Sequence, residues 1–174
     1  MYVKMHHEKK TAEKLSKMGI TNFLPVQEVV KQWSDRKKKV KQILIPMIIF
    51  VYIDDKTRIE ILNLIPSVIG TLIDKATNRP AVIRNEEMER FIFMLDYSEN
   101  SIKFITEPLE PGEIVEVIKG PLAGLQGEFI EEEGKSNVYV RIDMLGCAIV
   151  EIPISYLRKT EKNNIKNKIL LNNP

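Results

Sequence analysis

The chain has 174 residues, of which 44% are hydrophobic and 7% aromatic, a composition that allows one or two small cores and excludes a disordered tail protein. Its net charge of +2 hides an asymmetry, because residues 1–41 hold 11 Lys and Arg against 4 Asp and Glu, whereas residues 107–159 hold 5 against 10. Halves of opposite sign indicate two domains with different partners, and no apolar run approaches the roughly 20 residues that span a bilayer, so we expect a soluble, cytoplasmic protein without membrane contact.

Three amphipathic segments predict helices. The first runs from about Glu8 to Gly19, a glycine that suits the position just after a helix end. The second follows Asp54, stops at Pro66 and has an apolar stripe of Ile59, Leu62 and Ile65. The third begins at Asn85, a good N-cap, with a stripe formed by Met88, Phe91, Ile92 and Leu95.

Short runs rich in β-branched and aromatic residues lie between these helices and predict strands at residues 2–5, 22–26, 29–33, 40–45, 47–53 and 68–73. The run 47–53 is apolar at nearly every position, as expected of a central strand covered on both faces. Residues 33–41 carry turn residues and dense charge, which predicts a hairpin tip. The order of elements predicts an α+β sandwich with helices packed on an antiparallel sheet.

The C-terminal part has a different pattern. Residues 98–110 contain two prolines and no sustained periodicity, so we expect a linker between a domain at 1–97 and a second domain at 111–159. The second domain alternates at period 2 and has strand-like runs at 114–118, 128–132, 137–142 and 147–152, which predict a small, independent SH3-like β-barrel. Residues 160–174 are polar and Asn-rich, and predict a disordered tail.

A glycine-rich motif lies between the first two strands of the predicted barrel, within the sequence Pro-Gly-Glu-Ile-Val-Glu-Val-Ile-Lys-Gly-Pro-Leu-Ala-Gly-Leu-Gln-Gly-Glu-Phe that starts at position 111. Its glycines let the chain reverse tightly between two strands. This order of residues resembles the KOW motif, the strand-loop-strand signature of NusG-type transcription factors and of some ribosomal proteins. The motif residues are Gly120, Pro121, Leu122, Gly124 and Gly127.

The N-terminal half independently resembles the other NusG module, the NGN domain. Tyr-Val at 2–3, Phe-Leu-Pro at 23–25 and Ile-Pro-Met-Ile-Ile-Phe-Val at 45–51 occur in the family's order. The resemblance covers about residues 1–159 and implies a ferredoxin-like NGN sandwich followed by a KOW barrel. Within the family, three segments look most like the specialised antiterminators that open polysaccharide-biosynthesis operons in Bacteroides-type bacteria. They are residues 32–37, the Ile-Pro-Met form of the central strand at 45–47, and residues 93–98.

The resemblance implies a protein that rides on elongating RNA polymerase. In the family, an apolar depression on the NGN domain binds the coiled-coil clamp helices of the polymerase's largest subunit and suppresses pausing. Carried over by motif position, that surface comprises Tyr2, Ile48, Phe50 and Thr71. It is less aromatic than usual, since Ile48 and Thr71 stand where aromatic residues are common.

The resemblance also places a partner contact on the KOW domain, at Met144, Leu145 and Cys147. General NusG proteins use this strand turn to touch a ribosomal protein or the Rho terminator, with Phe and Arg where this chain has Leu145 and Cys147. The two replacements favour an altered partner.

Two basic groups are candidates for contact with non-template DNA or the leader of the nascent transcript. They are Lys9, Lys10 and Lys14 on the first predicted helix, and Arg36, Lys37, Lys38 and Lys39 in the predicted hairpin. Neighbouring cations repel each other unless an anion is near, which favours a phosphate-binding role for the hairpin group. The alternative for both groups is an ordinary solvated surface.

Other classes of function find little support. The single Cys147 and the adjacent His6 and His7 leave too few ligands for zinc, and no nucleophile elbow or Rossmann glycine pattern occurs, so we expect no metal, no cofactor and no enzyme. One alternative is an RNA-binding ribosome or translation factor, since KOW domains occur there, although the acidic second domain argues against it. Another is an adaptor that joins two proteins.

Overall fold

The computed structural model describes residues 1–32, 36–98, 101–106, 112–132, 134–142 and 144–160. Contacts divide the chain into two compact units, Met1–Val82 (unit 1) and Ile83–Pro174 (unit 2). Helices and strands are mixed in both units, as an α+β fold requires. This division by contacts falls ahead of the third helix, whereas the sequence predicts a domain boundary at 98–110. The predicted boundary concerns which segment folds independently, and it stays a prediction. The predicted tail at 161–174 lies outside the described residues.

Unit 1 is built on two antiparallel strand pairs that join edge to edge. β1 (Tyr2–Val3) pairs with β6 (Val68–Gly70), and β2 (Asn22–Phe23) pairs with β5 (Phe50–Val51). The Val3 amide donates to the Met47 carbonyl at 2.9 Å, and the Ile49 amide donates to the Met1 carbonyl at 3.1 Å. Residues 47–51 therefore lie between β1 and β2, in the central place that the sequence predicts. Only Phe50–Val51 of the predicted strand 47–53 is regular strand, and the expectation that both of its faces are covered is wrong, since Tyr52 is 75% exposed.

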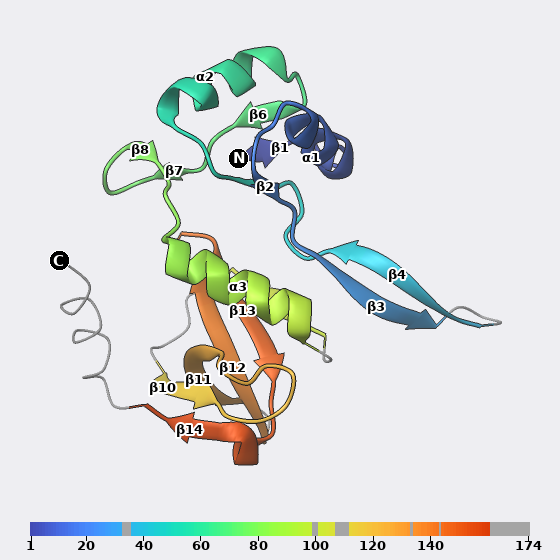
Figure 1. The fold of residues 1–174 in the computed structure, drawn as a ribbon, viewed down its shortest axis with the longest axis vertical. Helices are drawn as coiled ribbons and strands as arrows, with labels where there is room; N and C mark the ends of the chain where they lie inside the picture. The colour runs from blue at the N-terminus through green and yellow to red at the C-terminus, as the bar shows by residue number, and fades with distance from the viewer. Residues whose placement is uncertain (33–35, 99–100, 107–111, 133, 143, 161–174) are drawn as a thin grey trace. The chain divides into compact units, whose positions relative to one another are not determined.

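Two helices cover one face of these strands (Figure 1). α1 (Glu8–Lys17) contributes Leu15 and α2 (Asp55–Leu64) contributes Ile61, and both side chains are fully buried in one cluster with Val3 and Ile49. Burying each of these apolar side chains stabilises the folded unit by about 1.5–3 kcal/mol. The core of unit 1 thus lies between the two helices and one face of its strands.

For α1 and α2, the sequence predicts where the helices end better than it predicts which side chains they bury. Gly19 has φ 75° just after α1, as predicted. The helix α2 begins after Asp54, as predicted, and the Asp54 carboxylate caps it by accepting from the Thr57 amide at 2.8 Å. The predicted apolar stripe of α2 is wrong at Ile59, which is 51% exposed, whereas Ile61 is buried. Apolar residues occur on several faces of α2, so periodicity alone does not select the one that packs.

A long ribbon projects from unit 1 (Figure 1). β3 (Val26–Gln32) pairs antiparallel with β4 (Lys37–Ile43) in a separate two-stranded sheet, with Gln32 opposite Lys37. The predicted tip at 33–41 is therefore too long, because residues 37–41 lie in regular strand. Lysines are accepted there since both faces of an isolated ribbon reach water. Residues 33–35 lie outside the described residues.

A second, smaller hairpin closes unit 1. β7 (Ile73–Asp74) pairs with β8 (Arg79–Pro80), and Asp74 holds the turn by accepting from the Ala76 amide at 2.9 Å and the Thr77 hydroxyl at 2.7 Å. These hydrogen bonds stabilise the charged form and lower the pKa of the Asp74 carboxyl.

Unit 2 contains one six-stranded antiparallel sheet in the order β14–β10–β11–β12–β13–β9. Its strands are β9 (Lys103–Ile105), β10 (Glu113–Val117), β11 (Gln126–Glu132), β12 (Lys135–Ile142), β13 (Gly146–Glu151) and β14 (Leu157–Lys159), with a short 3₁₀ turn η1 (Ile154–Tyr156) before the last. All four predicted strands are confirmed. The pairing is that of an open sheet, so closure into a barrel stays a prediction. β9 lies within the predicted linker and forms one edge.

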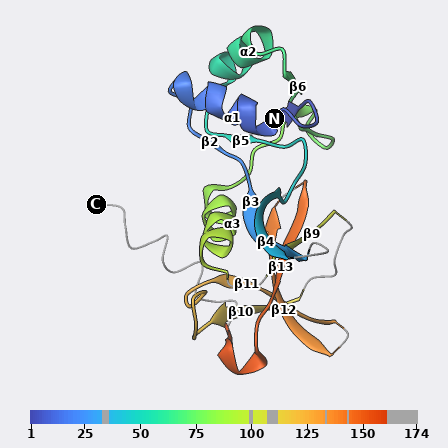
Figure 2. The same cartoon turned by 90° about the vertical axis from the view of Figure 1, so that its right-hand side faces the viewer.

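α3 (Asn85–Tyr97) packs against β12 within unit 2 (Figure 2). Phe91 and Met94 are its fully buried side chains. The predicted stripe shares only Phe91 with this buried face; its other members, Met88, Ile92 and Leu95, are half-buried. Because residues 91–95 of α3 are all apolar, the sequence predicts the helix but not the face that packs. The predicted N-cap is wrong by one residue, since Arg84 is at the N-cap position and Asn85 is the first residue of the helix. No helix of the described residues is long and apolar enough to cross a membrane.

The glycine-rich loop between β10 and β11 is a compact turn. The Gly124 amide donates to the Val117 carbonyl at 2.7 Å, and the Leu125 amide donates to the Leu122 carbonyl at 3.0 Å. Leu122 and Leu125 are buried, 6% and 2% exposed. Gly120 has φ 79°, and a Cβ there would lie 3.1 Å from the ring of Tyr156. The motif therefore closes one end of the sheet of unit 2.

A polar network joins the start of the second sheet to its middle strands. The Glu128 carboxylate accepts from Arg141 Nε at 2.7 Å, from the Tyr139 hydroxyl at 2.8 Å and from the Gly112 amide at 3.0 Å. Burial by itself raises the pKa of Glu128, but these hydrogen bonds outweigh burial and hold it below its usual value of 4.5. The network pins residue 112 beside β11.

We expect Gly146→Ala to destabilise unit 2 by about 2–4 kcal/mol. Gly146 has φ 143°, and a Cβ would lie 2.0 Å from the Ile105 carbonyl oxygen of β9. The matched control is Gly124→Ala, which shares a positive φ of 93° but meets no atom within 4 Å, and should cost only about 1–2 kcal/mol. Urea unfolding of both variants measures the difference. Equal losses would contradict the close approach of β9.

We expect Glu128→Gln to lower the free energy of unfolding by roughly 1–3 kcal/mol at pH 7, because it removes a charge-assisted hydrogen-bond acceptor. Since the folded pKa of Glu128 is below the unfolded value of 4.5, the stabilisation is complete well above pH 4.5 and is lost as the pH falls through the folded pKa. Urea titrations at pH 7 and at acid pH should show the gap between wild type and variant shrinking. Glu151→Gln, which breaks the exposed Lys135–Glu151 pair, is the control and should change stability by at most about 1 kcal/mol.

Candidate functional site

The strands of unit 1 have a second face, opposite the one that α1 and α2 cover. Side chains alternate along a strand, so the burial of Val3 and Ile49 in the core places their neighbours on the other face. The Cα register pairs Tyr2 with Ile48 and Phe23 with Phe50. These four side chains therefore share one apolar face, which we call the open face.

The structure brings three of the four predicted polymerase-binding residues onto adjoining strands of the open face. Tyr2 lies between Ile48 and Gly70, and Phe50 follows Ile48 at the same phase of the alternation. Tyr2 and Phe50 are half-buried, whereas Ile48 is only 5% exposed. Tyr2 and Phe50 are therefore the accessible members of the predicted set.

Thr71 is the fourth predicted member and directly follows the strand β6. Thr71 as a whole is half-buried. Its hydroxyl oxygen is buried and has no hydrogen-bond partner in the part of the chain that the structure describes. Thr71 adds little polar character to the surface of unit 1.

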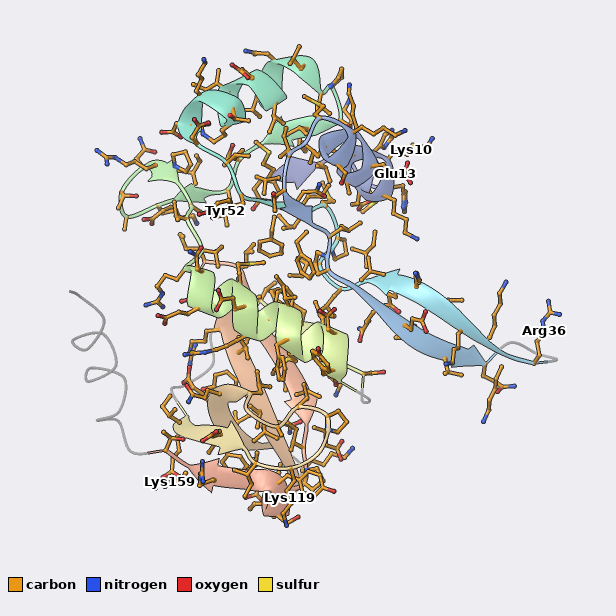
Figure 3. All side chains as sticks on the ribbon, viewed as in Figure 1. Lys10, Glu13, Arg36, Tyr52, Lys119 and Lys159 are labelled. Atoms are coloured by element: carbon orange, nitrogen blue, oxygen red, sulfur yellow. The ribbon has the colours of Figure 1, made fainter. Side chains whose placement is uncertain are left out.

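Two aromatic residues that the sequence reasoning missed belong to this region. Phe23 lies 6.3 Å from Phe50 between ring centroids, at an interplanar angle of 43°, a favourable tilted arrangement. Tyr52 continues the alternation beyond Phe50, is 75% exposed, and is labelled in Figure 3. Its amide donates to the Thr21 carbonyl at 2.9 Å, which extends the pairing of β2 with β5. The signal for Phe23 was present, since it opens the Phe-Leu-Pro segment, but its strand partner is visible only in the fold.

The lysines of α1 occupy its solvent side. Lys9, Lys10 and Lys14 are all exposed, and Lys10 projects from the helix together with Glu13 (Figure 3). Lys14 Nζ donates a hydrogen bond at 3.4 Å to the carbonyl of Leu64, which is the last residue of α2. Cations near a helix C-terminus are favourable, so part of the charge of Lys14 has a local structural partner.

The hairpin lysines form a second basic group, on β4. Arg36 lies at the far end of the ribbon (Figure 3), and Lys37, Lys38, Lys39 and also Lys41 are exposed along the strand. Lys41 continues the run of positive charge that begins at Arg36. Among the described residues, none of these four lysines has a carboxylate within ion-pair distance.

The three residues of the predicted partner contact in unit 2 differ in burial. Met144, with φ 65° in the turn between β12 and β13, is 46% exposed and Leu145 is half-buried. Cys147 is only 3% exposed and packs with Tyr139 and Ile149, and burial raises the pKa of its thiol. Met144 and Leu145 can meet a partner from this turn, whereas Cys147 belongs to the core.

The described parts of the two units contain no candidate metal site, because no three His, Cys, Asp or Glu side chains lie close together there. The two units instead offer surfaces: an aromatic sheet face and a cationic ribbon in unit 1, and a tight turn in unit 2. Such features bind macromolecules.

Comparisons with known proteins give a match to one family model and likenesses to solved structures. A family model described as "Transcription termination factor nusG" matches residues 1–92, which span unit 1 and the first part of α3. Among solved structures, NusG of Thermotoga maritima, described for its domain interaction, is 18% identical over 92% of this chain and 94% of that chain, with a TM-score of 0.47. A chain of the MjSpt4:Spt5 complex in conformation B is 19% identical over 92% of this chain and 95% of that one, with a TM-score of 0.26. A comparison with curated proteins gives no match.

Proposed function

This chain belongs to the NusG family of transcription factors, and we propose that it is an elongation factor that binds elongating RNA polymerase and promotes readthrough of a target operon. The observation that carries the proposal is the open face of unit 1. Three half-buried aromatic residues, Tyr2, Phe23 and Phe50, lie together on this sheet face, and contiguous apolar patches of this kind mark interaction sites. Apolar, aromatic surface is the usual centre of a protein–protein interface.

The partner that suits the open face is the clamp-helix coiled coil of the polymerase's largest subunit, as the family resemblance implies. The helices α1 and α2 cover the other side of the strands, so we assign the polymerase contact to the face that Tyr2 and Phe50 share. Helices dock on such faces by laying apolar side chains between the aromatic rings. Phe50, half-buried and next to Phe23, is the natural centre of this contact.

The basic residues of unit 1 supply a second contact in the same proposal. A factor held on the polymerase brings its cations close to the displaced DNA strand, whose phosphates attract them. We assign this contact to α1 and to the hairpin. For unit 2, the exposed turn at Met144 and Leu145 is the proposed site for a further protein partner, a ribosomal protein, Rho or another.

The target proposed for this factor is an operon of polysaccharide biosynthesis. This assignment rests on the resemblance of residues 32–37, 45–47 and 93–98 to the specialised antiterminators. The two domains proposed for this function are the NGN domain at 1–97 and the KOW domain at 111–159, the latter closing as an SH3-like barrel.

We expect Phe50→Arg to abolish co-purification of RNA polymerase with the full chain, because the substitution puts a charge into the middle of the aromatic face. The control is Ile59→Arg on α2, an exposed apolar residue on the covered side of the unit, which should keep binding. Circular dichroism of both variants should match the wild type. Ile48 is a poor test position, because a charge at a 5% exposed site threatens folding itself.

Retention of polymerase by Phe50→Arg at wild-type level would contradict the proposed surface. Co-purification of ribosomal subunits instead of polymerase would favour the ribosome-associated alternative. A transcription assay on a template with the operon's leader then tests readthrough: addition of the wild-type chain should raise the full-length product, and Phe50→Arg should not.

A further inference from the structure

The charges of the β3–β4 ribbon are arranged differently from those of the sheet in unit 2. In unit 2, basic side chains meet glutamates on neighbouring strands, as in Arg141–Glu128 at 2.7 Å and Arg158–Glu116 at 2.8 Å. Lys159 likewise meets Glu113 at 2.6 Å. Such cross-strand pairs stabilise a sheet by a few tenths of a kcal/mol to about 1 kcal/mol each.

The described lysines of β4 in the ribbon of unit 1 form no such cross-strand ion pairs. The Cα register sets Lys37 opposite Gln32, Lys39 opposite Val30 and Lys41 opposite Glu28. Even Lys41 and Glu28 form no ion pair, and no carboxylate among the described residues pairs with Lys37 or Lys39. The lysine row therefore costs the isolated ribbon electrostatic repulsion without a compensating pair.

The alternation of the strand sorts these lysines by face. Lys37, Lys39 and Lys41 occupy every second position of β4 and so lie on one face, whereas Lys38 lies at the opposite phase with Val40. Opposite the lysine row, on β3, this face presents the 61% exposed Val30 and no cation. The β3 row on this face consists of Gln32, Val30 and Glu28, so a straight row of three lysines lies beside a row with one exposed apolar side chain and one carboxylate.

The spacing of the row matches a nucleic-acid backbone. Two residues along a strand advance about 6.7 Å, so Lys37 to Lys41 covers about 13 Å. One strand of DNA places a phosphate every 3.4 Å or so along the helix axis, and about four phosphate steps fit beside the row. In the adjoining row, the exposed Val30 lies opposite Lys39 and can contact the sugars and bases on one side of that backbone.

We propose that Lys37, Lys39 and Lys41 form a phosphate-tracking row for a DNA strand, and that the opposite face of the ribbon, including Lys38, does not contact the DNA. This inference rests on the proposed function, which brings DNA near the hairpin, and adds the face and the residues that bind. It selects Lys37, Lys39 and Lys41 from the basic residues of the hairpin and assigns Lys38 to the opposite face.

The test is the salt dependence of DNA binding by the full chain, measured by fluorescence anisotropy with labelled single-stranded and duplex oligonucleotides. Each lost phosphate contact should reduce the slope of log K against log salt by about 0.7 for the single strand or about 0.9 for the duplex. We expect this reduction for Lys39→Gln and for Lys41→Gln. Lys38→Gln removes the same charge from the adjacent residue and should reduce the slope by less than half as much.

Lys75→Gln, in the exposed turn between β7 and β8, is the control for loss of one charge anywhere in unit 1. Equal reductions for Lys38→Gln and Lys39→Gln would overturn the assignment to one face, and unchanged slopes for Lys39→Gln and Lys41→Gln would overturn the row itself. Polymerase co-purification should persist in all four variants. Failure of the row therefore remains distinguishable from failure of the proposed polymerase contact.

Discussion

The alternation of side chains along residues 48–51 connects the stability of unit 1 to its proposed function. Ile49 is fully buried against α1 and α2, and this fixes Ile48 and Phe50 on the other face of the same segment. A shift of one residue in register would move the aromatic ring into the helical core and Ile49 into the binding face. The hydrogen bonds from Val3 to Met47 and from Ile49 to Met1 prevent such a shift. The core therefore sets which residues form the proposed binding surface.

Charge serves two purposes in this chain, and its placement separates them. In unit 2 the acidic excess seen in the sequence is used internally, because glutamates on β10 and β11 pair with arginines and lysines of neighbouring strands. The network at Glu128 also ties residue 112 to the sheet. On the ribbon of unit 1 the lysines have no such partners among the described residues. Unpaired cations in a row attract an anion from outside, which is the physical basis for assigning DNA to this element.

Close backbone approaches constrain unit 2 more than its side chains do. At Gly112 and Gly146 a Cβ would meet a backbone oxygen at 2.2 Å and 2.0 Å, so only glycine fits. Gly146 in this way sets β9 beside β13, although β9 comes from a segment whose prolines and irregular pattern predict a linker. The family's loop glycines have a different role, since Gly120 and Gly124 supply the positive φ that the turn between β10 and β11 needs.

The sequence by itself determined the elements whose signals are local. Asp54 and Gly19 mark helix ends because a cap needs only its own few neighbours, and the alternation at 137–142 and 147–152 predicts strands without reference to the fold. The motif order from Tyr2 to Gly127 was sufficient to indicate the family. Tertiary structure decided the rest: that α3 buries Met94, that β4 extends through Lys37–Lys41, that Phe23 stands beside Phe50, and that Cys147 is in the core. These outcomes depend on contacts between segments far apart in the chain, and an apolar helix or a charged strand can satisfy its local preferences in more than one orientation until those contacts select one.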